Sequence, residues 1–444
     1  MPEFLSNTTD PCVHCGFCLP TCASYRVLGS EMDSPRGRIH ALKAIERGEL
    51  TLDTTVASHF DSCLGCFACV SACPSGVRYD QLLETTRPKL NAPELRNPAE
   101  RAFRSLLFSL LPYPERLRAA LRPLKAYAGS RLQGWIRQAG LSRLLGPQLE
   151  AMEQLLPPLN QDSFHDRFPV LTPALGPKRG RVGFVLGCVQ RVFDPEVNAA
   201  TVSVLSANGF EVVIPPSQGC CGAATHHQGE TSLTEAFASD LINSFKQVVG
   251  EGKPAGSEPL DAVLVAASGC GHTMKQYGSI LHSQEHAKTF SAAVFDVHEF
   301  LDQQGLSEDF VRQLTPLQTN GKTTSITFHD ACHMLHGQQI KSAPRELLKR
   351  IPNVELREPM DAGVCCGSAG IYNLLRPAEA NQLGQMKAED LARTKPDWVS
   401  SANIGCTLQI KKHLNDQQPV PIAHPMQLLD QSFRGLSRTA KNMT

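Results

Sequence analysis

Eight of the sixteen cysteines form two runs of equal spacing near the start of the chain. Each run has the pattern C-x2-C-x2-C-x3-C. The short spacings let one tight loop present three thiolates to a cubane [4Fe–4S] cluster, and the fourth cysteine of each run ligates the other cluster. The predicted ligands are therefore Cys12, Cys15, Cys18 and Cys73 for one cluster, and Cys63, Cys66, Cys69 and Cys22 for the other.

Zinc and disulfide bonds are the alternative explanations of these runs. Zinc sites usually divide their ligands into two separated pairs, whereas each run here packs four cysteines into eleven residues. Disulfides require an oxidising compartment, and the opening MPEFLSNTTDP lacks the basic-then-apolar layout of a secretory signal. We therefore expect two [4Fe–4S] clusters. One departure is that Ala23 follows Cys22, whereas Pro74 follows Cys73 as the pattern requires.

Length and composition limit the architecture and the partners. A chain of 444 residues predicts roughly two to four domains. Basic and acidic residues are balanced at 43 each, which does not favour nucleic acid as a partner. No apolar run approaches the ~18 residues of a spanning helix. We expect a cytoplasmic protein whose membrane contact, on the inner membrane, is peripheral at most.

The first 90 residues are expected to form a mostly helical module that holds the two clusters. Ser34 and Pro35 form a plausible N-cap and first helical residue, and residues 36–46 carry apolar side chains at helical spacing. Gly48 then ends this helix. Residues 91–178 follow as a basic helical connector, in which Pro112, Pro114 and Pro123 separate short helices, and residues 157–177 are expected to be a linker.

The connector carries an unusual excess of positive charge. Between residues 101 and 149 a single acid, Glu115, accompanies nine basic residues: Arg101, Arg104, Arg116, Arg118, Arg122, Lys125, Arg131, Arg137 and Arg143. A solvated face on a connecting layer explains this pattern well, since basic amphipathic helices are common linkers. The alternative is a docking surface for a partner subunit or an anionic membrane.

The remaining residues contain an internal repeat, which we assign to domains 179–315 and 316–444. Corresponding cysteines lie 144, 145 and 136 residues apart, and apolar runs alternate with helical stretches in the same order in both halves. This alternation predicts parallel sheets with the cysteines beyond the carboxyl ends of strands. The fold class is thus a helical module followed by two repeated α/β cysteine-rich domains.

Each half supplies one cysteine, a vicinal pair and a fourth cysteine. The two sets are Cys188, Cys220, Cys221 and Cys270, and Cys332, Cys365, Cys366 and Cys406. These thiols could bind a further iron–sulfur cluster or zinc, act as redox dithiols, or remain unligated. Six histidines lie nearby in sequence: His226, His227, His272, His329, His333 and His336. His333 and His272 are closest to a cysteine and are candidates for ligands, proton carriers or supporting neighbours.

A site for a hydride-accepting cofactor is missing from the sequence. The chain contains neither G-x-G-x-x-G after a strand nor G-x-x-x-x-G-K-[ST]. Iron–sulfur clusters pass single electrons, so a two-electron oxidation requires an organic cofactor, which we expect on another polypeptide. We therefore predict no catalytic residue in this chain.

Seven motifs resemble the iron–sulfur subunit of glycolate oxidase (glycolate dehydrogenase). They are CVHCGFC at 12–18, PRGR at 35–38, CPSGVRY at 73–79, CCGA at 220–223, ASGCG at 267–271, CCGSAG at 365–370 and ANIGC at 402–406. The resemblance covers nearly the whole chain, and it implies that the first module is ferredoxin-like and that the repeats are cysteine-rich CCG domains. It also implies FAD-containing partner subunits that oxidise glycolate to glyoxylate and a quinone-type electron acceptor.

Related architectures leave other functions open. Iron–sulfur subunits of D-lactate and glycerol-3-phosphate dehydrogenases are similar, and heterodisulfide reductases share the repeat. In the last of these the repeat ends in C-x2-C, whereas here Thr273 and Gln409 stand at the second cysteine's place. A catalytic role of the repeats and a zinc-stabilised, redox-sensing scaffold are the remaining alternatives.

Overall fold

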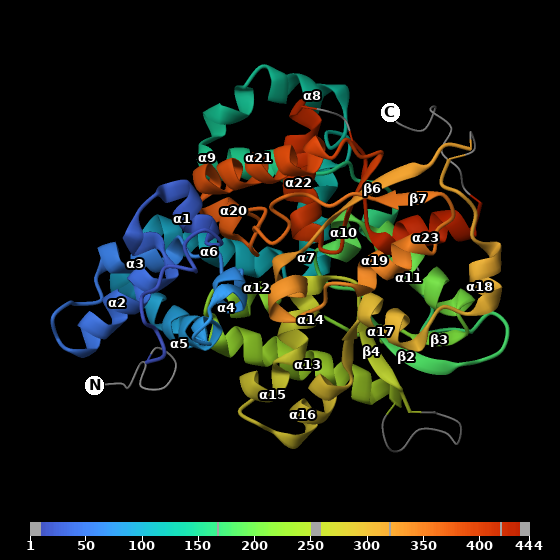
Figure 1. Ribbon diagram of the computed structural model, residues 1–444, viewed down its shortest axis with the longest axis horizontal. Helices are drawn as coiled ribbons and strands as arrows, with labels where there is room; N and C mark the ends of the chain where they lie inside the picture. Colours follow the sequence, from blue (N-terminus) through green and yellow to red (C-terminus); the bar gives the residue numbers. More distant parts are fainter. Residues whose placement is uncertain (1–9, 167, 250–258, 319–320, 418–419, 436–444) are drawn as a thin grey trace.

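The computed structural model describes residues 10–166, 168–249, 259–318, 321–417 and 420–435. Most of the opening segment that we examined for a secretory signal lies outside these residues. Figure 1 shows a helical N-terminal part on one side of the molecule and two α/β units beside it. Of the described helices, none is both long and apolar enough to span a membrane. The predicted fold class, a helical module followed by two repeated α/β domains, is confirmed.

The N-terminal module is helical, as the sequence predicts. In α2, Pro35 is the first residue and the Ser34 hydroxyl accepts a hydrogen bond from the amide of Gly37, so the expected cap is present. Apolar side chains that include Ile39, Leu42 and Phe60 form its core. Its elements are α1 Ala23–Leu28, η1 Glu31–Asp33, α2 Pro35–Glu46, α3 Thr54–Asp61, α4 Ala68–Ala72 and α5 Tyr79–Leu90.

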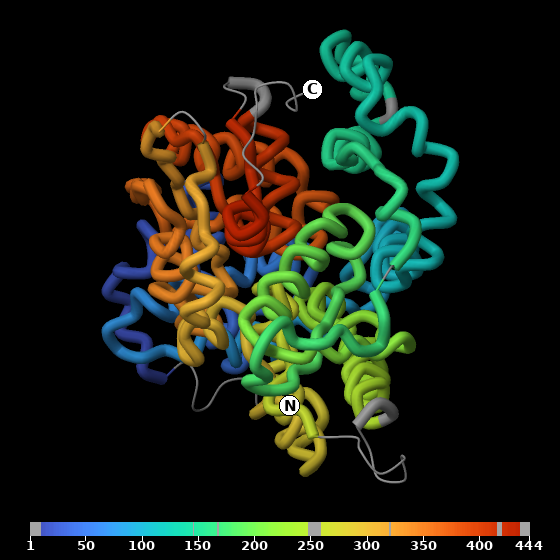
Figure 2. Tube along the Cα trace, turned by 90° about the vertical axis from the view of Figure 1, so that its right-hand side faces the viewer, coloured from blue at the N-terminus to red at the C-terminus, as the bar shows by residue number. Residues whose placement is uncertain are grey.

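The connector is a chain of short helices that the prolines delimit. Pro114 begins α7, and Pro123 lies within the turn η3. The elements are η2 Pro93–Leu95, α6 Pro98–Leu110, α7 Pro114–Leu121, η3 Arg122–Leu124, α8 Arg131–Gln138, η4 Leu141–Leu145 and α9 Pro147–Leu155. Figure 2 shows the teal part of this connector at the edge of the molecule. Six of the nine basic residues are exposed, whereas Arg104 and Arg118 are buried and paired with carboxylates.

The segment 157–177 is more structured than a simple linker. It contains the turn η5 Asp162–Phe164 and the short strand β1 Leu171–Thr172, which pairs antiparallel with β3 Phe210–Val213. Asp166 in this segment binds both Arg118 of α7 and Arg191 of the first repeat. The connector is thereby fixed to the first repeat by two buried guanidinium groups that share one partly exposed carboxylate.

The first repeat has a sheet of order β1-β3-β2-β4-β5, parallel except for β1. Its strands are short and almost wholly apolar, as expected for strands covered on both faces. The elements are β2 Gly180–Val185, α10 Gln190–Phe193, α11 Pro195–Ala207, β3, α12 Ala223–His227, α13 Thr231–Val249, β4 Ala262–Val265, α14 Ser268–Lys275, α15 Tyr277–Ile280, α16 Glu285–Ala292, β5 Val294–Asp296, α17 Val297–Gln304 and α18 Glu308–Gln313.

The second repeat follows the same order, β7-β6-β8-β9, with all pairs parallel. Its elements are β6 Thr324–His329, the π-helical turn η6 His333–Gly337, α19 Ala343–Lys349, β7 Val354–Leu356, α20 Tyr372–Leu375, α21 Pro377–Arg393, β8 Trp398–Ser401, α22 Ile404–Gln417, β9 Ile422–Ala423 and α23 Pro425–Phe433.

One apolar core joins the two repeats. It contains Val182 and Leu264 of the first sheet together with Ile326 and Val399 of the second. Helices α11 and α17 of the first repeat contact α23 and α19 of the second. The two sheets are therefore held in a fixed relation, and the loops that carry their cysteines face a common space.

Candidate metal centres

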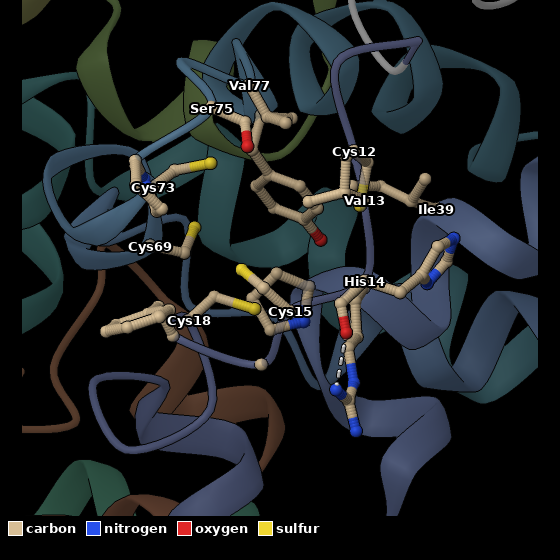
Figure 3. Close-up of a pocket in the computed structure, with 16 residues that line it drawn as sticks. Cys12, Val13, His14, Cys15, Cys18, Ile39, Cys69, Cys73, Ser75 and Val77 are labelled. Carbon is tan, nitrogen blue, oxygen red and sulfur yellow. Dashed lines mark hydrogen bonds between the residues drawn. The ribbon is translucent and has the colours of Figure 1, made fainter.

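The first cysteine run lines a cavity at the surface of the N-terminal module. Its walls include the thiols of Cys12, Cys15, Cys18 and Cys73, and Figure 3 shows their sulfur atoms gathered around it. The loop turns through left-handed backbone at His14 and Gly16, which aims the neighbouring cysteines inward. These four residues are the ones that the crossover rule assigns to one cluster.

The second cysteine run lines a more deeply buried cavity. Cys22, Cys63, Cys66 and Cys69 surround it, so Cys22 joins the three cysteines that the spacing predicts. Cys69 also lines the first cavity and therefore lies between the two. Sulfur is the donor that iron–sulfur clusters require, and both cavities fit that chemistry.

Hydrogen-bond donors and a buried cation surround the sulfur atoms of the second cavity. The Gly65 amide and the Tyr79 hydroxyl lie 3.4 Å and 3.8 Å from Cys63 Sγ. The Arg38 side chain is fully buried and donates to Ser24 Oγ, Ser62 Oγ and the His59 carbonyl. Such donors and charges stabilise thiolates and influence cluster potentials.

The pKa values of these cysteines show two opposing effects. Burial would raise the pKa of Cys63, but the nearby guanidinium groups of Arg38 and Arg87 lower it. Burial raises the pKa of Cys66 and Cys69, and neighbouring thiolates add to that effect. Four thiolates without a metal are therefore unfavourable here, as expected for a site whose charge a bound cation neutralises.

The cysteines of the two repeats meet at one shared cavity, which is partly open to solvent. Its lining residues include Cys188, Cys220, Cys221, Cys270, Cys332, Cys365 and Cys406. The cysteines lie beyond strands β2, β4, β6 and β8 or in the loops that lead from β3 and β7. The structure thus brings together cysteines that are more than 200 residues apart.

Within each repeat the thiols form a connected set. Cys220 Sγ lies 3.4 Å from Cys188 Sγ, and the Gly222 amide donates to Cys220 Sγ. Hydrogen bonds from Cys220 and, to a smaller extent, from Cys270 lower the pKa of Cys221. The pKa values of Cys220 and Cys270 are themselves raised. These hydrogen bonds favour the ionised form at Cys221 over Cys220 and Cys270.

The glycines after the vicinal pairs allow a close approach of the backbone. Gly222 and Gly367 both have positive φ, at 78° and 87°. A Cβ at Gly367 would lie 2.7 Å from the Ala380 carbonyl oxygen. At Gly367 only glycine satisfies both requirements, the positive φ and the close approach of the backbone.

The N-terminal module contacts the repeats through its second cavity. Cys66 packs with Cys332 and Cys365 in an apolar cluster that also contains Leu64 and Ala23. The second cavity and the shared cavity of the repeats are therefore adjacent. The first cavity lies on the opposite side of Cys69.

Histidines line the same boundary and anchor the module. His227 Nε2 donates to the Leu64 carbonyl at 2.8 Å, and His333 Nε2 donates to the Gly65 carbonyl at 3.0 Å. His272 and His333 pack on the ring of Phe67, both at 5.4 Å between centroids. Burial lowers the pKa of His272 to about 2 and that of His333 to about 4, so both rings are neutral.

The histidine that forms a potential metal-binding group with cysteines is a different one. Among the described residues, ligand atoms of His329, Cys366 and Cys406 lie within 4.8 Å of one another. From the sequence, His329 is only one of six histidines near the cysteines, and His333 and His272 are the candidates for ligands or proton carriers. The sequence feature that identifies it is its place as the last residue of a strand, three residues before Cys332.

Comparisons with known proteins agree with this arrangement. Family models match residues 8–77 as a "4Fe-4S dicluster domain", 99–156 as "Glycolate oxidase iron-sulfur subunit, linker region", and 182–275 and 326–411 as "Cysteine-rich domain". Each part of the fold described above thus has a counterpart among known families.

Two relatives are similar over most of their length. A "Probable glycolate oxidase iron-sulfur subunit" of Bacillus subtilis is 34% identical over 406 residues, covering 90% of this chain and 88% of the relative. The "Glycolate oxidase iron-sulfur subunit" of Escherichia coli is 33% identical over 427 residues, covering 95% and 93%. One of the subunits of the fumarate reductase (CoM/CoB) of Methanothermobacter marburgensis is 30% identical, covering 57% and 46%. The chain therefore belongs to the family of glycolate oxidase iron-sulfur subunits.

Proposed function

We propose that this chain is the electron-transfer subunit of a flavin-dependent glycolate dehydrogenase. FAD-containing partner subunits oxidise glycolate to glyoxylate, and this chain carries the electrons to a quinone-type acceptor. The observation that carries the proposal is the row of cysteine-lined cavities, which runs from the surface at Cys15 to the cavity between the repeats. The names of the two most complete relatives support glycolate as the substrate.

Each N-terminal cavity supplies the ligands for one [4Fe–4S] cluster, with Cys73 and Cys22 as the crossover ligands. When bound, such clusters pass single electrons. The protein contributes thiolates, the amide of Gly65, the hydroxyl of Tyr79 and the buried charge of Arg38. The eight cysteines of the repeats provide a further metal or cluster site beside Cys66.

A peripheral membrane contact fits a quinone-type acceptor. The connector exposes Leu132, Trp135, Leu141 and Leu144 among basic residues, and Leu144 is 83% exposed. Exposed apolar side chains surrounded by Arg and Lys are typical of segments that bind anionic membrane surfaces. We assign this role to the connector, and the chain otherwise acts in the cytoplasm.

Anaerobic purification from two hosts tests the division of labour. The tagged chain made alone should contain iron and sulfide but no flavin, and dithionite but not glycolate should bleach it. The chain purified from its own host should carry flavin-containing partners, and glycolate should then bleach its clusters. Oxidation of glycolate by the isolated chain, or reduction of the assembly by D-lactate or glycerol 3-phosphate but not by glycolate, would contradict the proposal.

A second candidate is that the repeats catalyse acceptor or disulfide reduction themselves. The shared cavity favours it, because cysteines of both repeats line one cavity that is partly open to solvent. Replacing Cys221 or Cys366 by Ser should then abolish acceptor reduction while the N-terminal clusters are still reduced. Normal turnover of both variants would eliminate this candidate. Zinc without acid-labile sulfide in the purified chain would instead favour the redox-sensing scaffold.

A further inference from the structure

The two repeats differ chemically at equivalent places in their central strands. His329 is the last residue of β6, three residues before Cys332, and Val185 is the last residue of β2, three before Cys188. The neighbouring strand repeats the difference: Ser401 pairs with His329 in the register of the second sheet, and Val265 pairs with Val185 in the first. The second repeat therefore has a polar pair where the first has two valines.

These polar side chains are buried without protein partners. His329 is 1% exposed and Ser401 is 0% exposed. Among the described residues, neither ring nitrogen of His329 nor the hydroxyl of Ser401 has a hydrogen-bond partner. Because leaving a buried polar group unsatisfied is costly, a group without a protein partner calls for a bound water or ion.

Two thiols lie within reach of the imidazole. Ligand atoms of His329, Cys366 and Cys406 all lie within 4.8 Å of one another, and each of the three residues is buried. The Asn403 amide donates to Cys406 Sγ at 3.4 Å, which stabilises a thiolate there. Two thiolates and an imidazole form a soft-to-borderline donor set, typical of zinc or of iron.

We propose that His329, Cys366 and Cys406 bind a single metal ion, for which Zn²⁺ is the best match. Zinc bonds of ~2.3 Å to sulfur and ~2.0–2.1 Å to nitrogen place tetrahedral ligands roughly 3.3–3.8 Å apart, so a small inward movement completes the site. Thiolates on different irons of a cubane lie farther apart than the ligands of one ion. Three protein ligands leave a fourth position open on this ion.

The proposed metal site distinguishes the second repeat from the first. In the first repeat, Val185 packs with Cys221 in an apolar cluster, so its cysteine set has no equivalent imidazole. The inference deepens the proposed metal-binding role of the repeat cysteines and names the ion and the third ligand. It does not depend on the two N-terminal clusters, whose iron is measured separately in the experiment below.

The test uses the full chain, purified anaerobically and supplied with Zn²⁺ alone. Wild type should retain about one zinc per chain. His329→Val copies the residue of the first repeat and should lower zinc retention against a chelator at least about tenfold while iron stays unchanged. The matched control is His413→Val, since His413 is also a buried histidine of this repeat with an unpartnered Nε2, and its zinc should be normal.

X-ray absorption at the zinc edge gives a readout that is independent of activity. Wild type should show mixed nitrogen and sulfur neighbours, and His329→Cys should keep its zinc with sulfur neighbours only. Three results would overturn the proposal: no zinc in the wild type, unchanged zinc in His329→Val, or loss of iron instead of zinc in that variant. The iron content of the N-terminal module reports on the proposed electron-transfer function in the same samples.

Discussion

Arg38 places a permanent positive charge among the sulfur atoms of the second N-terminal cavity. Its side chain is fully buried and interacts electrostatically with Cys63 and Cys22. A nearby positive charge favours the reduced, more negative state of a cluster. Arg38→Met should therefore lower the reduction potential of the cluster bound there by on the order of 100 mV, as measured by EPR-monitored redox titration.

Two further variants separate charge from packing. Arg38→Lys keeps the charge and should keep most of the potential, although it loses the forked hydrogen bonds to Ser24 and Ser62. Arg47→Met is the control, because Arg47 is exposed and pairs with Glu49. Equal potentials in Arg38→Met and wild type would show that the guanidinium does not act on this cluster.

The crossover of ligands can be tested by combining cysteine substitutions. Cys15→Ser and Cys73→Ser should each remove about half of the iron, since both belong to the same predicted ligand set and serine is a poor ligand for soft metals. The double variant of these two should lose no more iron. Cys15→Ser combined with Cys22→Ser should lose nearly all of it. If Cys15→Ser with Cys73→Ser empties both sites, each run binds its own cluster and the crossover assignment is wrong.

At the residue scale, the sequence predicts only those ligand groups whose residues lie close together in the chain. The grouping of Cys12, Cys15 and Cys18 follows from one loop, so it is visible in the chain itself. His329 and Cys366 meet only after a sheet and a following loop have formed, so no local pattern marks them as neighbours. Arg38 likewise resembles any basic residue of a helix until its burial is known.

At the scale of elements, Asp166 joins the connector to the first repeat. Arg118 of α7 and Arg191 of α10 both donate to its carboxylate, and both guanidinium groups are nearly buried. Asp166→Asn leaves Arg191 without its carboxylate partner and Arg118 with only the exposed Glu115, and should cost about 3 kcal/mol of local stability. Amide hydrogen exchange in residues 114–121 and 190–193 should accelerate roughly a hundredfold.

The pH dependence of this junction has a definite sign. Burial would raise the pKa of Asp166, but hydrogen bonds from Arg118 and Arg191 lower it below the ordinary value. Its stabilising effect is therefore full above the unfolded-state pKa of aspartate, and it is lost as the pH falls through the lower folded-state pKa. Asp309→Asn removes an exposed pair with Arg312 and should change neither exchange nor its pH dependence.

The elements of the repeats were predictable because their apolar runs and helical stretches are strong local patterns. The apolar run at residues 182–186 largely coincides with β2 at 180–185, and that at 398–402 with β8 at 398–401. The strand β1 was missed, because two residues in a proline-rich segment carry no periodicity and pair only through tertiary contact.

At the scale of the whole molecule, the three cysteine-lined cavities form a continuous row. The contact of Cys66 with Cys332 and Cys365 depends on packing between segments that are 266 and 299 residues apart in the sequence. The repeat in the sequence predicted two similar domains, but their common core and common cavity depend on how α11 and α17 pack against α23 and α19. No local sequence pattern in either repeat predicts that packing.

The surface of the connector that we propose binds a membrane also belongs to the scale of the whole molecule. Trp135 is 58% exposed and Leu144 83% exposed, and Arg131 and Arg143 flank them. Trp135→Glu combined with Leu144→Glu removes apolar area and adds negative charge beside an anionic lipid surface. The double variant should bind vesicles that contain phosphatidylglycerol at least about tenfold more weakly than wild type in co-sedimentation.

The control for this surface is Met360→Glu, because Met360 is 88% exposed in the second repeat, outside the connector. It changes the same kind of side chain and should leave vesicle binding unchanged. Added salt should weaken wild-type binding only in part, since screening acts on the Arg residues and not on the buried apolar area. Equal binding of wild type and the double variant, or binding of wild type that salt abolishes completely, would show that Trp135 and Leu144 do not enter the bilayer.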